Sequence, residues 1–207
     1  MRNALPLLFA VLTVTAAAQT DTTMVRYQGG FEFHDGIYFS FQSFRDNAPT
    51  VPKEKLTTDQ GQPVTDLRNT NKVYYPDSTG KRAKIDFDHI WGFCYDGVVY
   101  VGAGDGFSRI GLMGSISHLV FDATYRNLDP YMFNGNTSYT TEVERFLDMA
   151  TGALLPVTAD GLYTVLKTDP VLKEEFDALP KKQRNKQETL FLYMRRYNDR
   201  HPLYFPR

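Results

Sequence analysis

The side chains best suited to chemistry in this chain are Asp86, Asp88 and His89, which lie together ahead of a stretch with a strong β-hairpin pattern. Imidazole and carboxylate groups can exchange protons with a substrate, and they can also bind a metal ion. In a strand, Asp86 and Asp88 would share one face and His89 would point to the other, so joint action would need a bend. Asp105 could add a further carboxylate to such a site. The spacing favours the alternative, a solvated strand entrance without catalysis.

A second group with functional potential is the aromatic cluster of the hairpin itself, residues 90–101. Asp96-Gly97 readily takes the positive φ angles of a two-residue type I′ turn, and this turn fixes the pairing register. Side chains alternate between the faces of a strand, which predicts one shared aromatic face. That face would be formed by Trp91, Phe93, Tyr95 and Tyr100. It could bind a sugar or a peptide, or it could be core packed against C-terminal helices, and the core interpretation is favoured.

Sequence motifs for cofactors, metals and nucleophiles are absent, which weakens the case for an enzyme. The glycines of 102–106 are followed by a strand pattern, whereas phosphate binding needs a helix at that point. Neither Gly-x-Ser-x-Gly nor His-Glu-x-x-His occurs. We therefore expect no cofactor and no metal. Cys94 is the only cysteine, which excludes an intramolecular disulfide, and its place in the hairpin predicts a buried, unreactive thiol.

The first 18 residues have the pattern of a secretory signal peptide. Arg2 gives a short basic start, an apolar run covers residues 4–14, and small residues precede an expected cleavage site after Ala18. The apolar run is too short to span a bilayer stably, and no second run approaches spanning length. We expect an exported, soluble protein, periplasmic or secreted, without a transmembrane segment once the signal is removed.

Residues 19–207 have the length of one domain, and their pattern changes from strands to helices along the chain. We expect a flexible tether over 19–30, with at most an edge strand, and a β-rich part over 31–157. Tight turns between successive β-prone runs predict an antiparallel meander of about five to eight strands. Apolar stripes of helical period then predict two to three helices over 158–207. The expected fold class is α+β.

Local signals add detail to this layout. Ser40 could cap a single helical turn, and Asp169 followed by Pro170 predicts the start of a helix after the period changes to helical at Thr158. The composition of 50–70 predicts a loop with a short strand near its start, and 72–87 has the pattern of a hairpin. The longest loop is expected at 126–138.

Three stretches carry a likeness to other proteins: Asp35-Gly36-Ile37-Tyr38 followed by Phe44 and Pro49, the run Ile90-Trp91-Gly92-Phe93, and the closing run 193–202. They resemble uncharacterised secreted proteins of Bacteroidetes-type bacteria, over most of the chain after the signal. The resemblance implies an envelope or secreted location and transfers no catalytic residue. Two short motifs also resemble the O-glycosylation signal of such bacteria, and a third matches an N-glycan sequon. These motifs are Asp21-Thr22-Thr23, Asp77-Ser78-Thr79 and Asn136-Thr137-Ser138.

Three functions are compatible with the sequence. The leading hypothesis is a non-catalytic binding or envelope-interaction module, whose partner would be an envelope protein or a glycan. A hydrolase acting on envelope or extracellular polymer is the second, using Asp86, Asp88, His89 and Asp105. The third is a structural subunit of a secreted assembly. Residues 167–207 hold 10 Lys and Arg against 6 Asp and Glu, which we interpret as a solvated helix surface, and we expect no nucleic-acid partner.

Overall fold

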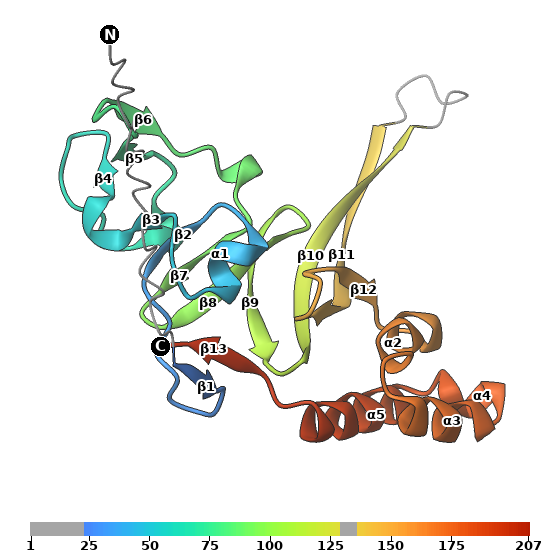
Figure 1. Ribbon diagram of the computed structural model, residues 1–207. Helices are drawn as coiled ribbons and strands as arrows, with labels where there is room; N and C mark the ends of the chain where they lie inside the picture. Colours follow the sequence, from blue (N-terminus) through green and yellow to red (C-terminus); the bar gives the residue numbers. More distant parts are fainter. Residues whose placement is uncertain (1–22, 129–135) are drawn as a thin grey trace, which may run out of the picture.

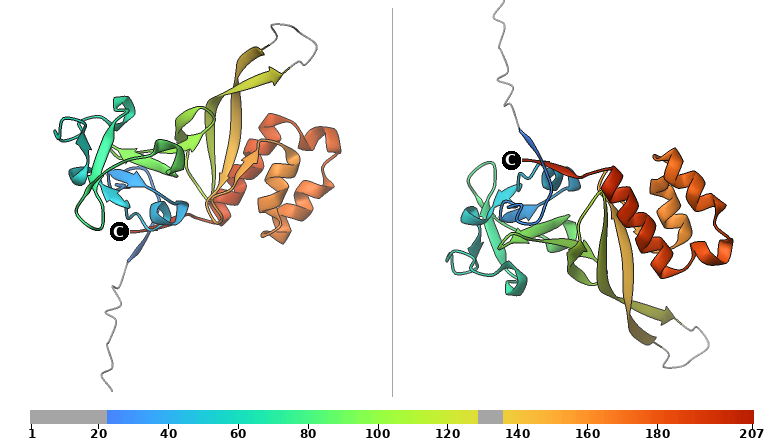
Figure 2. Two further views of the ribbon diagram at one scale, coloured as in Figure 1. Left: turned by 90° about the horizontal axis from the view of Figure 1, so that it is seen from above. Right: turned by 90° about the horizontal axis from the view of Figure 1, so that it is seen from below.

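A computed structural model describes residues 23–128 and 136–207, and it confirms the α+β class. The expected signal peptide and its cleavage site at Ala18 lie outside the described residues, as do Asp21 and Thr22. Within the described part, an antiparallel sheet of eight strands forms the centre, and helices gather at one end of it (Figure 1). A smaller three-stranded sheet lies at the opposite end (Figure 2).

The large sheet is a meander extended by two strands from earlier in the chain. Its strand order is β12-β11-β10-β9-β8-β7-β2-β3, so the six strands after residue 91 are neighbours in sequence order. The bounds are β2 (Gly36–Tyr38), β3 (Val51–Pro52), β7 (Gly92–Tyr95), β8 (Val98–Ala103), β9 (Gly106–Leu112), β10 (Ile116–Leu128), β11 (Asn136–Asp148) and β12 (Leu154–Pro156). Short connections between the consecutive strands from β7 to β10 account for their antiparallel order.

Two smaller sheets complete the β structure. The hairpin expected at 72–87 forms, but it joins a separate sheet with strand order β4-β5-β6. Its strands are β4 (Thr57–Thr58), β5 (Val73–Pro76) and β6 (Arg82–Lys84). At the other end of the chain, β1 (Met24–Arg26) pairs antiparallel with β13 (Tyr204–Pro206). The expected helical part therefore ends in a strand that the sequence pattern did not reveal.

The first three helices each begin after a residue whose side chain caps the backbone. Ser40 forms a capping box with Ser43 at the start of α1 (Phe41–Arg45). Thr158 caps α2 (Ala159–Leu166), and Asp169 caps α3 (Pro170–Ala178), which begins with proline. Two further helices follow, α4 (Lys181–Arg184) and α5 (Gln187–Arg200), and the 3₁₀ turns are η1 (Lys53–Lys55), η2 (Leu67–Asn69) and η3 (Phe87–His89).

The central hairpin has the predicted register. Tyr95 pairs with Val98, and the pairing continues to Gly92 opposite Val101. The turn residues have the positive φ angles of a type I′ turn, 49° at Asp96 and 70° at Gly97. Both faces of the hairpin are covered, because Cys94 and Val99 belong to one core cluster and Phe93 to another.

The prediction that the C-terminal helices cover the aromatic face of the hairpin is wrong. Buried side chains of α2, α3 and α5 pack instead on Ile116 of β10 and Phe146 of β11. Because only two residues separate β12 from α2, the helices are held beside the β11 end of the sheet, away from the hairpin (Figure 1).

Strands β10 and β11 form a long arm that extends beyond the rest of the sheet (Figures 1 and 2). Thirteen residue pairs join them in a regular register, from Ile116 opposite Asp148 to Leu128 opposite Asn136. The loop expected at 126–138 is therefore shorter than predicted, since Arg126 and Ser138 are paired within the arm. Thr-, Tyr- and Val-rich sequence on both sides suits paired strands. The turn signals at 129–130 and 134–135 lie outside the described residues.

Candidate functional site

The acidic and histidine residues ahead of the hairpin lie on a helical turn, and the expectation of a strand there is wrong. Asp86 caps η3, and its carboxylate accepts a hydrogen bond from the backbone N–H of Asp88. One turn of helix brings Asp86 Oδ2 within 2.8 Å of His89 Nδ1. Both side chains are exposed, at 64% and 81%. A hydrogen bond from His89 lowers the pKa of Asp86, and the two side chains form a solvated hydrogen-bonded pair on the surface.

Asp105 does not join this pair. It lies in the turn between β8 and β9, where its backbone N–H donates to the carbonyl of Asp122 on β10. No hydrogen bond or ion pair connects the side chains of Asp105 and Asp88 with each other or with His89 among the described residues. The same part of the chain contains no group of three or more His, Cys, Asp or Glu side chains placed to hold a metal ion.

The predicted aromatic face is divided between the two sides of the sheet. Phe93, Tyr95 and Tyr100 lie on one side, as expected, but Trp91 lies on the other and stacks on Phe44 with ring centroids 4.5 Å apart. The strand begins at Gly92, immediately after the η3 turn. Strict alternation therefore does not extend back to Trp91, and a platform of all four aromatic residues does not exist.

Of the three remaining aromatic residues, Phe93 and Tyr100 line a pocket of about 490 Å³, which we call the aromatic pocket. Phe93 and Tyr100 form its stacked floor, with ring centroids 4.9 Å apart and an interplanar angle of 16°. Phe107 packs against Phe93 and against Phe87. The complete lining is Leu67, Arg68, Thr70, Asn71, Phe87, Phe93, Tyr100, Gly106 and Phe107.

Polar groups at the rim of the aromatic pocket come from the η2 segment. Arg68 is held by Asp66 through two parallel bonds of 2.9 Å, from Nε and from one terminal nitrogen. Hydrogen bonds from Arg68 lower the pKa of Asp66 to about 2. The guanidinium also lies over the ring of Tyr95, whose hydroxyl donates to the carbonyl of Thr65. The rim is thus fixed before a ligand arrives.

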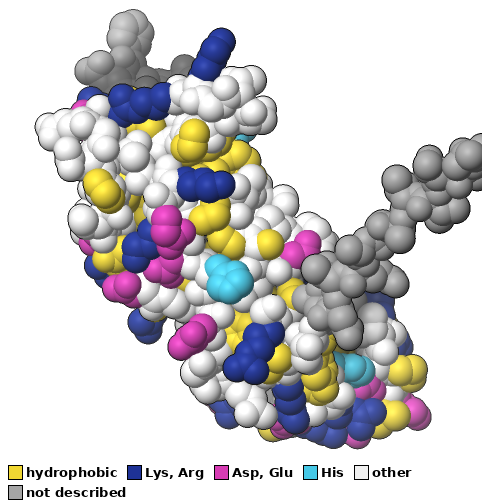
Figure 3. Space-filling view, turned by 60° about the vertical axis from the view of Figure 1, so that its left-hand side comes forward, with side chains coloured by type: hydrophobic (Ala, Val, Ile, Leu, Met, Phe, Trp, Pro, Cys, Tyr) yellow, Lys and Arg dark blue, Asp and Glu magenta, His cyan; other side chains and the backbone are white. Residues whose placement is uncertain are grey.

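The face that carries the three-stranded sheet shows hydrophobic side chains exposed among basic and acidic ones (Figure 3). A flat apolar floor with a few fixed polar groups is the usual composition of a small-ligand site. Sequence reasoning identified Phe93 and Tyr100 but missed Arg68, Phe87 and Phe107. These residues come from three separate segments, and only the folded chain brings them together.

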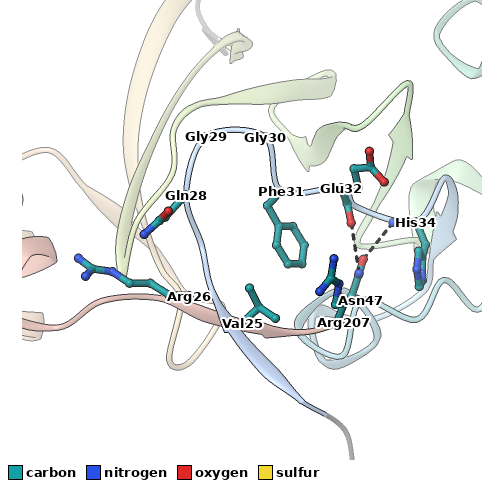
Figure 4. A pocket seen from close by; sticks show the side chains of 10 residues that line it. All are labelled: Val25, Arg26, Gln28, Gly29, Gly30, Phe31, Glu32, His34, Asn47 and Arg207. Atoms are coloured by element: carbon teal, nitrogen blue, oxygen red, sulfur yellow. Dashed lines mark hydrogen bonds between the residues drawn. The ribbon is translucent and has the colours of Figure 1, made fainter.

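A second pocket of about 470 Å³ lies beside β1 and the loop of residues 28–34, with Asn47 and Arg207 in its lining. Figure 4 shows Phe31 inside it, while Arg26 and Gln28 point away from the centre. The buried side chain of Asn47 accepts a hydrogen bond from the backbone N–H of His34 and donates to the carbonyl of Glu32. Its polar groups are therefore engaged in holding the loop of residues 28–34, and this pocket lacks a convergent set of free groups.

The comparisons with known proteins decide nothing about family. The chain matches no protein-family model, no curated protein and no solved structure at a significant level. Function must therefore be inferred from the geometry. Within residues 23–128 and 136–207, no helix is long and apolar enough to cross a membrane.

A polar cluster around the buried Asp169 was not predicted from sequence beyond its helix cap. The carboxylate of Asp169 accepts from Arg200 at 2.6 Å and lies 2.9 Å from His201 Nε2. The Arg200 guanidinium holds the pKa of Asp169 well below its usual range. Ser115 lies nearby, but its hydroxyl donates to the backbone carbonyl of His201 and not to the imidazole. The cluster resembles a catalytic triad in composition only, and its bonds fasten the chain after α5.

Proposed function

We propose that this chain is an exported binding module whose aromatic pocket binds a ligand with one apolar face and a hydroxyl-bearing edge. A sugar ring of an envelope or extracellular glycan has this form. The observation that carries the proposal is the stacked Phe93–Tyr100 floor beside the fixed Arg68. Aromatic faces bind such rings with little loss of rotamer freedom, and the rim groups supply directional hydrogen bonds.

Export and an envelope or secreted location are part of the proposal. They are supported by the basic start at Arg2, the apolar run and the small residues before Ala18, together with the resemblance to secreted Bacteroidetes-type proteins. Binding is favoured over hydrolysis because the surface pair of Asp86 and His89 lines no part of the aromatic pocket.

Titration with defined glycans tests the proposal. The purified chain without residues 1–18 would be titrated with soluble peptidoglycan fragments and a panel of neutral and acidic oligosaccharides by isothermal calorimetry. We expect binding by at least one of them, and Tyr100→Ala should weaken it by roughly tenfold or more through loss of about 1.5 kcal/mol of stacking.

Tyr204→Ala is the matched control, since Tyr204 is an exposed tyrosine on β13 and lines no part of the aromatic pocket. It should leave the affinity unchanged. Equal binding by wild type and Tyr100→Ala would place the ligand elsewhere. A wild-type protein that binds no glycan of the panel would overturn the proposal.

A further inference from the structure

The β10–β11 arm carries an unpaired strand edge in its described part, which is independent of the aromatic pocket. Strand β12 pairs only with residues 145–147 of β11, so the edge of β11 is open from Glu144 towards the tip of the arm. The part of this open edge whose side chains are described is residues 138–144. Figures 1 and 2 show the arm projecting from the body, and no described strand pairs with this stretch. Gln187 of α5 reaches it only at the side chain of Glu144.

The hydrogen bonds at the base of the arm show which backbone groups face outward. The N–H of Asp148 donates to Ala153 on the β12 side, whereas the N–H of Met149 donates to Ser115 on the β10 side. Because backbone groups alternate between the two sides of a strand, Ser138, Thr140 and Glu142 direct their N–H and C=O groups outward. These outward groups form a row of backbone donors and acceptors with which another extended strand can pair.

Of the usual protections of a free edge, only charge is present here, at Glu142 and Glu144. Residues 138–144 contain no Lys and no Pro, and the β10–β11 register shows no bulge. Tyr139 is 52% exposed and stacks on Tyr125 across the arm. A long, regular edge with aromatic and β-branched residues is a typical pairing surface.

We infer that this edge pairs antiparallel with the same edge of a second copy of the chain, around a twofold axis at Thr141. In this register Thr140 lies opposite Glu142 of the second copy, so each Glu142 carboxylate faces a hydroxyl donor. Ser138 lies opposite Glu144, whose carboxylate also accepts from Gln187 of its own chain. Tyr139 lies opposite Val143 on the other face. The edge is therefore complementary to itself, as an isologous interface requires.

Other pairings are less favourable. Moving the register by one step towards the base places Glu142 opposite Glu142, which is destabilising because like charges then lie side by side. The opposite edge of the arm is obstructed, since the β8–β9 turn packs on it: Asp105 donates to the carbonyl of Asp122, and Gly104 lies against Phe121.

Cysteine cross-linking tests the register. In the proposed dimer the two Thr141 Cα atoms are about 4.5 Å apart, which suits a disulfide. Thr141→Cys should therefore form a covalent dimer under mild oxidation. Ala123→Cys is the matched control, because Ala123 lies directly opposite Thr141 on β10. Its two copies would be about 14 Å apart, three strand spacings, and should not cross-link.

Sedimentation velocity over a range of concentrations tests the dimer itself. We expect a dimer whose fraction rises with protein concentration. Thr140→Pro should abolish this dimer, since proline removes an outward N–H. Thr124→Pro, on the opposite edge of the arm, should leave the dimer intact. Trp91 emission confirms that each variant is folded. The inference is overturned by a monomer at every concentration, by a dimer that persists in Thr140→Pro, or by equal cross-linking of the two cysteine variants.

Discussion

The side-chain amide of Asn198 on α5 forms two hydrogen bonds with the backbone of one residue, Ile116 at the start of β10. Its Oδ1 accepts from the Ile116 N–H at 2.7 Å, and its Nδ2 donates to the Ile116 carbonyl at 2.8 Å. A side chain on Gly114 would collide with this amide. The last helix is thus fixed to the turn that begins the arm.

Asn198→Ala should lower the free energy of unfolding by about 2–3 kcal/mol, because it leaves the N–H and C=O of the buried Ile116 without partners. Urea denaturation measures the change. Asn185→Ala is the control, since Asn185 bonds only an exposed helix carbonyl and its loss should cost less than about 0.5 kcal/mol. Equal effects of the two substitutions would contradict this role.

Asp35 should make stability depend on pH. Burial raises the pKa of Asp35, but bonds from Lys53 and from the N–H groups of Gly97 and Asp96 outweigh it, so the pKa is lowered on folding. A lowered pKa contributes stability that is present above the unfolded value of 3.8 and is lost as pH falls through the folded value.

The Asp35→Asn variant should therefore be about 1–2 kcal/mol less stable than wild type at pH 7, and the difference should shrink below pH 4. Asp96→Asn is the control, because Asp96 also lies near Lys53 but is 74% exposed. A difference that stays constant from pH 7 to pH 2.5 would count against the ionised carboxylate.

Trp91 should report on the core and not on the aromatic pocket. Its ring stacks on the fully buried Phe44, so we expect blue-shifted emission and weak quenching by iodide. Phe44→Ala should shift the emission to the red and destabilise the fold by about 3–5 kcal/mol. Glycan bound in the aromatic pocket should leave the emission unchanged. A large change on binding would show that the ligand occupies the other face.

The thiol of Cys94 should be unreactive in the folded protein. Burial raises its pKa strongly, and its hydrogen bond to the Asp35 carboxylate acts in the same direction. Ellman's reagent should modify it only after unfolding, whereas a Ser78→Cys variant, with its new thiol in an exposed turn, should react at once at that position. Rapid labelling of native Cys94 would indicate that the hairpin opens.

The features predicted best from sequence were turns and helix starts, which residues adjacent in the chain determine. Asp96-Gly97 determined a turn and with it the register of the hairpin, and Thr158 and Asp169 marked two helix starts. Prediction from sequence failed where a contact joins distant segments. The face of Trp91 depended on the η3 turn before it, and the position of the helices depended on Asn198 and the short β12–α2 connection.

The candidate site shows the same division. Phe93 and Tyr100 could be placed together from the hairpin register alone. Arg68 and Phe87 reach the pocket from segments whose relative position is set by tertiary packing, and no local pattern encodes that position. Asp86 and His89 come together because this stretch forms a helical turn. Its polar composition did not show whether the stretch would be a helical turn or a strand.

The pairing of β1 with β13 determines how the protein responds to mechanical load. Thr23 and Arg207 are neighbours at one end of this antiparallel pair, joined by a backbone hydrogen bond. Tension applied at these two residues would peel the strands apart one bond at a time instead of shearing all bonds together. The ends would therefore detach at low force, while the eight-stranded sheet would bear the load only afterwards.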